Sequence, residues 1–143
     1  EQSLITVNGI QTLTDSLNTL RSYAVDNTQP APSVNDYQIA GVSGVDSDNL
    51  DDINQQVDEQ TLLSVDAMRS LTSSLNTIRA YAEDNTQPAP NETDYTIVGV
   101  SGVDTDNVSE INQQVDEQSI LVVDAMRDVM ASVLTIRTYA SDN

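Results

Sequence analysis

Two clusters of acidic residues offer the clearest opportunity for chemistry in this sequence. They read DSDNLDD at positions 46–52 and DTDNVSE at positions 104–110. Closely spaced carboxylates supply the oxygen ligands that Ca²⁺ prefers in proteins. The candidate calcium ligands are Asp46, Asp48, Asp104 and Asp106.

The spacing of these acids argues against calcium binding. An EF-hand loop needs Gly at its sixth position and Glu at its twelfth, and counted from Asp46 those positions hold Asp51 and Val57. The second cluster also has Ser109 in place of Asp51. Asp is a preferred N-cap residue, and the helix dipole stabilises acids in the first turn. We therefore expect Asp46 and Asp104 to be helix N-caps, and we expect no metal or other cofactor.

The chain lacks several residue types that enzymes commonly use for catalysis. Nucleophilic catalysis needs a general base, and the sequence contains neither His nor Lys. Cys is also absent, so thiolate nucleophiles, disulfides and thiolate or imidazole metal sites are excluded. Paired carboxylates could hydrolyse glycosides only in a concave cleft, and a thin helical chain offers little concavity. We predict no enzymatic activity and no catalytic residues.

The five arginines and five tyrosines are sparse enough for each to invite a specific role. Arg21, Arg79 and Arg137 lie late in long helical patterns, where a cation meets the C-terminal end of the helix dipole or pairs with neighbouring acids. Tyrosine has an apolar body and a polar tip, which suits the edge of a small core. We favour these structural roles over ligand binding by the arginines and carbohydrate stacking by the tyrosines.

The charge balance excludes two classes of partner. Five basic residues face 23 acidic ones, which gives a net charge of −18. Nucleic acids and anionic membrane surfaces both need a basic footprint, which this chain lacks. No apolar run approaches the roughly 20 residues that span a bilayer. We therefore predict no nucleic-acid binding, no membrane insertion and a monomeric chain.

An internal repeat positions all of these residues. Arg21, Arg79 and Arg137 follow one another at intervals of 58 residues, and INQQVDEQ occurs at both 53–60 and 111–118. A period of this length is typical of tandem structural units. We divide the chain into the C-terminal helix of a preceding repeat at 1–27, a first full repeat at 28–85 and a second at 86–143. Because the sequence opens within the periodic pattern, we expect it to be a piece of a longer protein.

Each repeat contains three segments of helical character. The longest, at 65–82 in the first repeat, places apolar residues at steps of three and four, so that they form one stripe along a helix. The shortest, at 33–41, begins with the spacing of a capping box and ends in a glycine suited to a C′ position. The third starts at Asp46 and carries apolar residues on one face. The expected caps are Ser33, Asp36, Gly41 and Asp46 in the first repeat and Asn91, Asp94, Gly99 and Asp104 in the second.

The junction between the third segment and the long one is open to two interpretations. The apolar stripe that ends at Val57 does not continue in register into Leu62, Leu63 and Val65. Either the helix breaks around 58–61, or one long helix changes the face that it buries, as in spectrin-like rods. In both cases we expect an all-α fold of tandem three-helix units in an elongated array. One bare repeat has too little aliphatic core to be stable alone, so shared helices should close each unit.

Part of each repeat resembles a known family. The stretches APSVNDYQIAGVSGVDSDNLDDIN at 31–54 and APNETDYTIVGVSGVDTDNVSEIN at 89–112 are similar to the APTxxDYxxAGVxGVxxxNLxxVN repeats of very large surface proteins and adhesins of Gram-negative bacteria. The resemblance covers a little under half of the chain. Two departures are the tight VDEQT junction, where typical members insert an Ala/Gly-rich linker, and Val108 in place of a leucine.

The resemblance implies an extracellular, mostly helical stalk on the bacterial cell surface. Such a stalk is a structural spacer that projects a terminal adhesive domain, and its partners are the neighbouring repeats of the same chain. The alternative is a repeated recognition module that binds a host or matrix protein through an exposed helix face. A recognition module should repeat an apolar or aromatic patch on that face. The two copies differ partly at polar positions, which favours the spacer.

Overall fold

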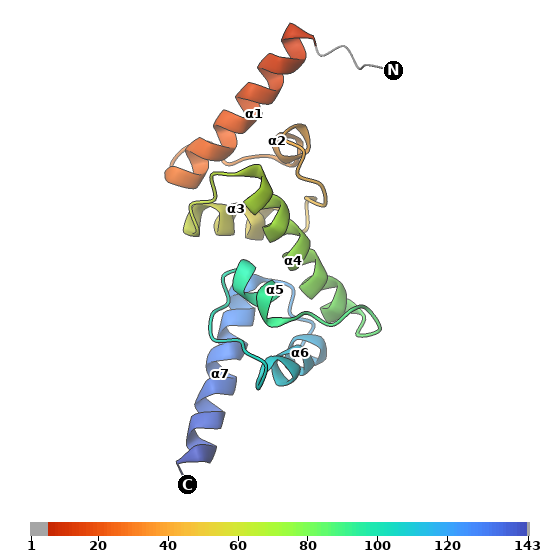
Figure 1. Ribbon diagram of the computed structural model, residues 1–143, viewed down its shortest axis with the longest axis vertical. Coiled ribbons are helices and arrows are strands. Elements are labelled where there is room, and N and C mark those ends of the chain that lie inside the picture. Colours follow the sequence, from red (N-terminus) through yellow and green to blue (C-terminus); the bar gives the residue numbers. More distant parts are fainter. Residues whose placement is uncertain (1–5, 143) are drawn as a thin grey trace. The chain divides into compact units, whose positions relative to one another are not determined.

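A computed structural model describes residues 6–142, and within that range it contains seven α-helices and no strand (Figure 1). This arrangement confirms the all-α fold class. The helices are α1 (Val7–Val25), α2 (Val34–Ile39), α3 (Leu50–Glu59), α4 (Val65–Glu83), α5 (Glu92–Ile97), α6 (Val108–Glu117) and α7 (Val123–Ser141). The opening residues of the motif EQSLITV lie outside the described residues.

The chain divides into two compact units, the first extending through Thr72 and the second starting at Ser73. The first unit contains α1, α2, α3 and the beginning of α4, and the second contains the rest of α4 with α5, α6 and α7. The unit boundary therefore falls inside α4, whereas the sequence repeats begin at 28 and 86.

Each unit has an aliphatic core with one tyrosine at its centre. In the first unit α1 packs against α2 and α3, and in the second α6 packs against α7. Residues without exposed surface include Leu20, Tyr37, Ile53 and Val57 in the first unit and Tyr95, Ile111, Val115 and Met126 in the second. The apolar spacing seen in the sequence thus corresponds to the buried face of α4, whereas the first half of the same stripe in α1 and the second half in α7 are exposed.

Local hydrogen bonds define both ends of the short helix α2. The Ser33 hydroxyl accepts from the N–H of Asp36 at 3.3 Å, and the Asp36 carboxylate accepts from the N–H of Ser33 at 2.9 Å, which makes a capping box. Gly41 has φ 81°. The N–H of Val42 donates to the carbonyl of Tyr37 at 2.8 Å, as in a Schellman motif. Asn91, Asp94 and Gly99 occupy the same positions around α5.

The start of the next helix differs from the sequence expectation. We expected Asp46 and Asp104 to be the N-caps, but α3 and α6 begin four residues later and have Asn49 and Asn107 at that position. The Asp46 carboxylate accepts from the N–H groups of Asp48 and Asn49, at 2.9 and 3.1 Å. Asp46 therefore caps a turn that leads directly into α3, because the N–H of Leu50 donates to the carbonyl of Asp46 at 3.1 Å.

The chain is not helical between Glu59 and Val65, so α3 and α4 are separate helices. The structure therefore agrees with the first interpretation of this junction, in which the helix breaks around residues 58–61. Thr61 takes φ 49°, and its equivalent Ser119 does the same. The N–H of Leu62 then donates to the carbonyl of Val57 at 2.9 Å. This is the Schellman-type bond that usually follows a glycine at the C-terminal end of a helix, here with Thr61 in the glycine position.

Replacing Thr61 by Gly should raise the free energy of unfolding by about 1 kcal/mol. A positive φ costs a residue with a Cβ roughly 1–2 kcal/mol, and Gly avoids that cost while losing more chain entropy on folding. Thr61→Ala is the matched control, because Ala keeps the Cβ and should not gain. Urea unfolding of the two variants measures the difference. Equal effects of Gly and Ala would show that the φ of Thr61 carries no strain.

Candidate helix-docking site

The contacts that recur in the two repeats lie where a long helix meets the short helices that follow it in the chain. We call the segments 28–64 and 86–122, which hold α2 with α3 and α5 with α6, the docking segments. The second half of α1 contacts the first docking segment within the first unit, and the second half of α4 contacts the second docking segment within the second unit. The site is therefore built twice, from equivalent residues.

A serine on the long helix binds the aspartate of the capping box. The Ser16 hydroxyl donates to the Asp36 carboxylate at 3.1 Å, and the Ser74 hydroxyl donates to the Asp94 carboxylate at 2.9 Å. Both serines are buried. Partial burial raises the pKa of Asp36, but hydrogen bonds from Ser33 and Ser16 outweigh it and hold that pKa below its usual value. The charged carboxylate thus fixes both the helix start and the long helix.

An arginine five residues further along the long helix binds the loop that ends the docking segment. Arg21 Nε donates to the carbonyl of Leu63 at 3.3 Å, and an Arg79 guanidinium nitrogen donates to the carbonyl of Leu121 at 2.8 Å. Neither arginine lies in the last turn of its helix, where we expected a contact with the helix dipole. The arginines instead satisfy carbonyl groups in the loop between α3 and α4 and the loop between α6 and α7.

A buried tyrosine and asparagine join the parts of each docking segment. The Tyr37 hydroxyl donates to Asn54 Oδ1 at 2.7 Å, and the Asn54 amide donates to the carbonyl of Pro32 at 3.0 Å. In the second copy, Tyr95 donates to Asn112 at 2.6 Å, and Asn112 donates to the carbonyl of Pro90 at 2.9 Å. These bonds connect the proline that precedes each docking segment's first helix with a tyrosine of that helix and an asparagine of the second helix.

The tyrosine hydroxyls lie deeper than we expected from the sequence. Tyr37 and Tyr95 have no exposed surface, rather than a tip at a polar edge. Burial, together with neighbouring Tyr and Asp side chains, raises the pKa of Tyr37 and of Tyr95 well above the ordinary value of 10.0, so both hydroxyls remain protonated donors. Sequence reasoning missed Asn54 and Asn112 as their partners, although both begin the repeated NQQVDEQ motif.

The candidate calcium ligands are not brought together with further acids. Within residues 6–142, no group of three or more His, Cys, Asp or Glu side chains could hold a metal ion. The Asp104 carboxylate accepts from the N–H groups of Asp106 and Asn107, as Asp46 does in the first copy. None of the helices in this part of the chain is long and apolar enough to cross a membrane.

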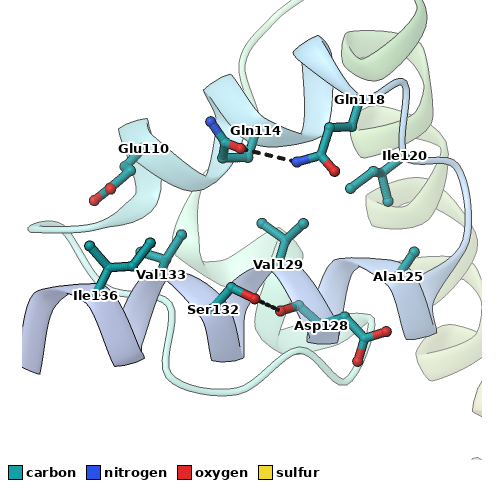
Figure 2. A pocket seen from close by; sticks show the side chains of 10 residues that line it. All are labelled: Glu110, Gln114, Gln118, Ile120, Ala125, Asp128, Val129, Ser132, Val133 and Ile136. Atoms are coloured by element: carbon teal, nitrogen blue, oxygen red, sulfur yellow. Dashed lines mark hydrogen bonds between the residues drawn. The ribbon is translucent and has the colours of Figure 1, made fainter.

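The second unit also carries an open groove of about 510 Å³ between α6 and α7 (Figure 2). Apolar side chains from α7 line one side of it, and Gln114, Gln118 and Ile120 line the other. Its residues on α7 include Val129, Ser132, Val133 and Ile136. Ser132 is the equivalent of Ser16 and Ser74 in the repeat. The groove therefore lies where the first two long helices receive a docking segment.

Comparison of the chain with protein-family models, with curated proteins and with solved structures gives no match.

Proposed function

We propose that this chain is a structural spacer from the stalk of a large bacterial surface adhesin, located outside the cell. Its tandem three-helix units would form an array that holds a terminal adhesive domain away from the cell surface. The observation that carries the proposal is the recurrence of one set of contacts at the period of the sequence repeat. The recurring pairs are Ser16 with Asp36, Arg21 with Leu63, Ser74 with Asp94, and Arg79 with Leu121.

In the proposed array each long helix serves two docking segments. The first half of α4 contacts the segment of its own repeat, where Arg69 donates to the carbonyl of Gly41 at 2.7 Å. The second half of α4 contacts the next segment, through Ser74 and Asp94. Repeats that bury their faces only against neighbours behave as one-dimensional arrays, whose length grows with the number of copies. This is the property that a spacer needs.

The exposed apolar side chains favour the spacer over a recognition module. A module that binds a host protein through each repeat should expose the same patch each time. In α1, Val7 is 82% exposed and Ile10 is 52% exposed, whereas Met68, the equivalent of Ile10 in α4, is 1% exposed. Leu13, which is 39% exposed in α1, likewise corresponds to the fully buried Leu71 in α4, so this apolar patch is not exposed in both repeats. A net charge of −18 further opposes close approach between units, within the limits of salt screening.

Chains with two, three and four full repeats should gain a constant increment of maximum dimension for each added repeat. The reason is that every repeat adds the same contacts to its neighbour. Small-angle X-ray scattering at physiological salt measures the increment. A maximum dimension that levels off beyond two repeats would contradict the spacer function.

The rival function makes a different prediction for the same protein. If the chain is a recognition module, it should by itself bind host cells or matrix proteins at micromolar concentration, and substitutions at exposed helix positions should abolish that binding. A spacer should bind none of them. In cells, deletion of whole 58-residue units should shorten the reach of the adhesive domain in steps while the purified terminal domain binds as before.

A further inference from the structure

Among residues 6–142, no docking segment packs against the second half of α7, whereas one packs against the equivalent part of α1 and one against that of α4. Ser132 is exposed, and its hydroxyl donates to the carbonyl of Asp128 in its own helix at 2.9 Å (Figure 2). Ser16 and Ser74, the equivalent residues, are buried and donate across to aspartates of a docking segment. The same serine thus has a different partner when no docking segment is present.

Arg137 differs from its equivalents in the same way. Arg21 and Arg79 donate to carbonyls of the docking segment that follows their helix. Arg137 instead donates to the carbonyl of Asp106 at 2.8 Å and to the carboxylate of Glu110 at 3.4 Å, both in its own repeat. These are exposed contacts, which water and salt weaken, so Arg137 is available for another acceptor at low cost.

The apolar stripe of α7 is also left uncovered at these positions. Ile78 in α4 has no exposed surface, whereas its equivalent Ile136 is 63% exposed. Ala82 is buried, and its equivalent Ala140 is exposed. Ile136 lies at the end of the groove between α6 and α7, next to Val133 (Figure 2). The groove thus continues into an exposed apolar face.

We propose that this groove binds a third docking segment, a polypeptide with the chemistry of residues 86–122. In this complex Ser132 leaves the carbonyl of Asp128 and donates to the aspartate of the incoming capping box. Arg137 donates to a carbonyl of the loop that ends the segment, and Ile136 is covered by the short helices. The proposal extends the array in the proposed function by naming what binds its open end, and it does not depend on where the protein is located.

The contacts within this chain identify the occupant. Two other docking segments bind the same serine and arginine positions, so the groove repeats an interface that the chain already forms. A second copy of this chain offers no free docking segment, because α1 contacts residues 28–64 and the second half of α4 contacts residues 86–122. The occupant is therefore an additional segment.

The test adds a copy of residues 86–122 directly after Asn143, so that it follows an Asp–Asn pair as it does after Asn85. Hydrogen exchange of α7 is compared in the original and the extended chain at physiological salt. Docking should slow exchange of the amides from 133 to 141 by roughly tenfold or more, because covered helix ends open less often. Unchanged exchange would overturn the proposal.

Two variants of the extended chain locate the contact. Ile136→Glu should remove the gained protection, because it places a charge in the covered apolar face. Ala131→Glu adds the same charge at the equivalent of Ser73, which stays exposed in α4, and should leave the protection in place. Equal effects of both variants would overturn the proposed face. Both positions are exposed in the original chain, so neither variant should prevent it from folding.

Two further outcomes separate this inference from the others. Concentration-dependent protection of the same amides in the original chain would mean that a second copy covers the groove, which would overturn the proposed occupant. Protection in the extended chain together with a maximum dimension that fails to grow with added repeats would support docking while contradicting the spacer function. Growth of that dimension without protection of α7 would support the spacer function while contradicting docking of a third segment.

Discussion

Replacing Asn54 by Ala should destabilise the first unit by about 2–6 kcal/mol, one of the two largest effects expected of a single substitution in this chain. Asn54 is 6% exposed and accepts from the Tyr37 hydroxyl while it donates to the carbonyl of Pro32. Ala leaves both groups buried without a partner, and each unsatisfied group costs about 1–3 kcal/mol. Hydrogen exchange of the amides in α2 and α3 measures the loss locally, since a chain of two units need not unfold in one step.

A double-mutant cycle distinguishes the hydrogen bond from the lost side chain. Tyr37→Phe alone should cost about 1–2 kcal/mol, because it leaves Asn54 Oδ1 without a donor. The double variant Tyr37→Phe with Asn54→Ala should cost less than the sum of the two single variants. It removes both the donor and the acceptor of this hydrogen bond, so neither is left buried without a partner. Asn35→Ala, at an exposed position of α2, is the control and should change little. Strict additivity in the cycle would show that the buried bond contributes nothing specific.

The parts of the fold that could be predicted from sequence are those fixed by residues close together in the chain. The capping box of Ser33 with Asp36 needs only a spacing of three, and the turn at Gly41 needs only a residue that tolerates a positive φ. The long helices follow from apolar residues at steps of three and four. Each of these features is decided locally, so a single sequence contains the information.

Local competition explains where the prediction of element ends was wrong or open. Asp46 and Asn49 are both good turn residues, and sequence spacing alone does not decide which of them precedes the helix. The break after α3 depends on Thr61 at a positive φ, a conformation for which β-branched residues give no sequence signal.

The docking site escaped sequence reasoning because its partners are far apart in the chain. Ser16 and Asp36 are separated by 20 residues, and Arg79 and Leu121 by 42. Arg21 and Arg79 donate to backbone carbonyls, and the sequence gives no sign of which carbonyl an arginine will reach. The signal that could have found the site is the repeat itself, since a serine and an arginine recur at fixed distances from the next capping box.

Three equivalent positions give the remaining large prediction, since Leu20, Ile78 and Ile136 occupy the same place in three long helices. Leu20→Ala and Ile78→Ala should each lower the free energy of unfolding of their own unit by about 2–5 kcal/mol, because both side chains are fully buried and Ala leaves a cavity. Ile136 is 63% exposed, so Ile136→Ala should stay within about 0.5 kcal/mol of the original chain. Hydrogen exchange in each unit, or urea unfolding followed by local probes, measures the three values.

The extended chain then supplies the decisive comparison for Ile136. When a third docking segment follows Asn143, Ile136 should become as costly to truncate as Ile78, because the same side chain would then lie under short helices. The Ile136→Ala variant of the original chain is its own control, with identical local sequence and no segment to cover it. A small cost in both chains would mean that α7 remains open even beside a suitable segment. A large cost in the original chain would mean that Ile136 is already packed, which its exposure contradicts.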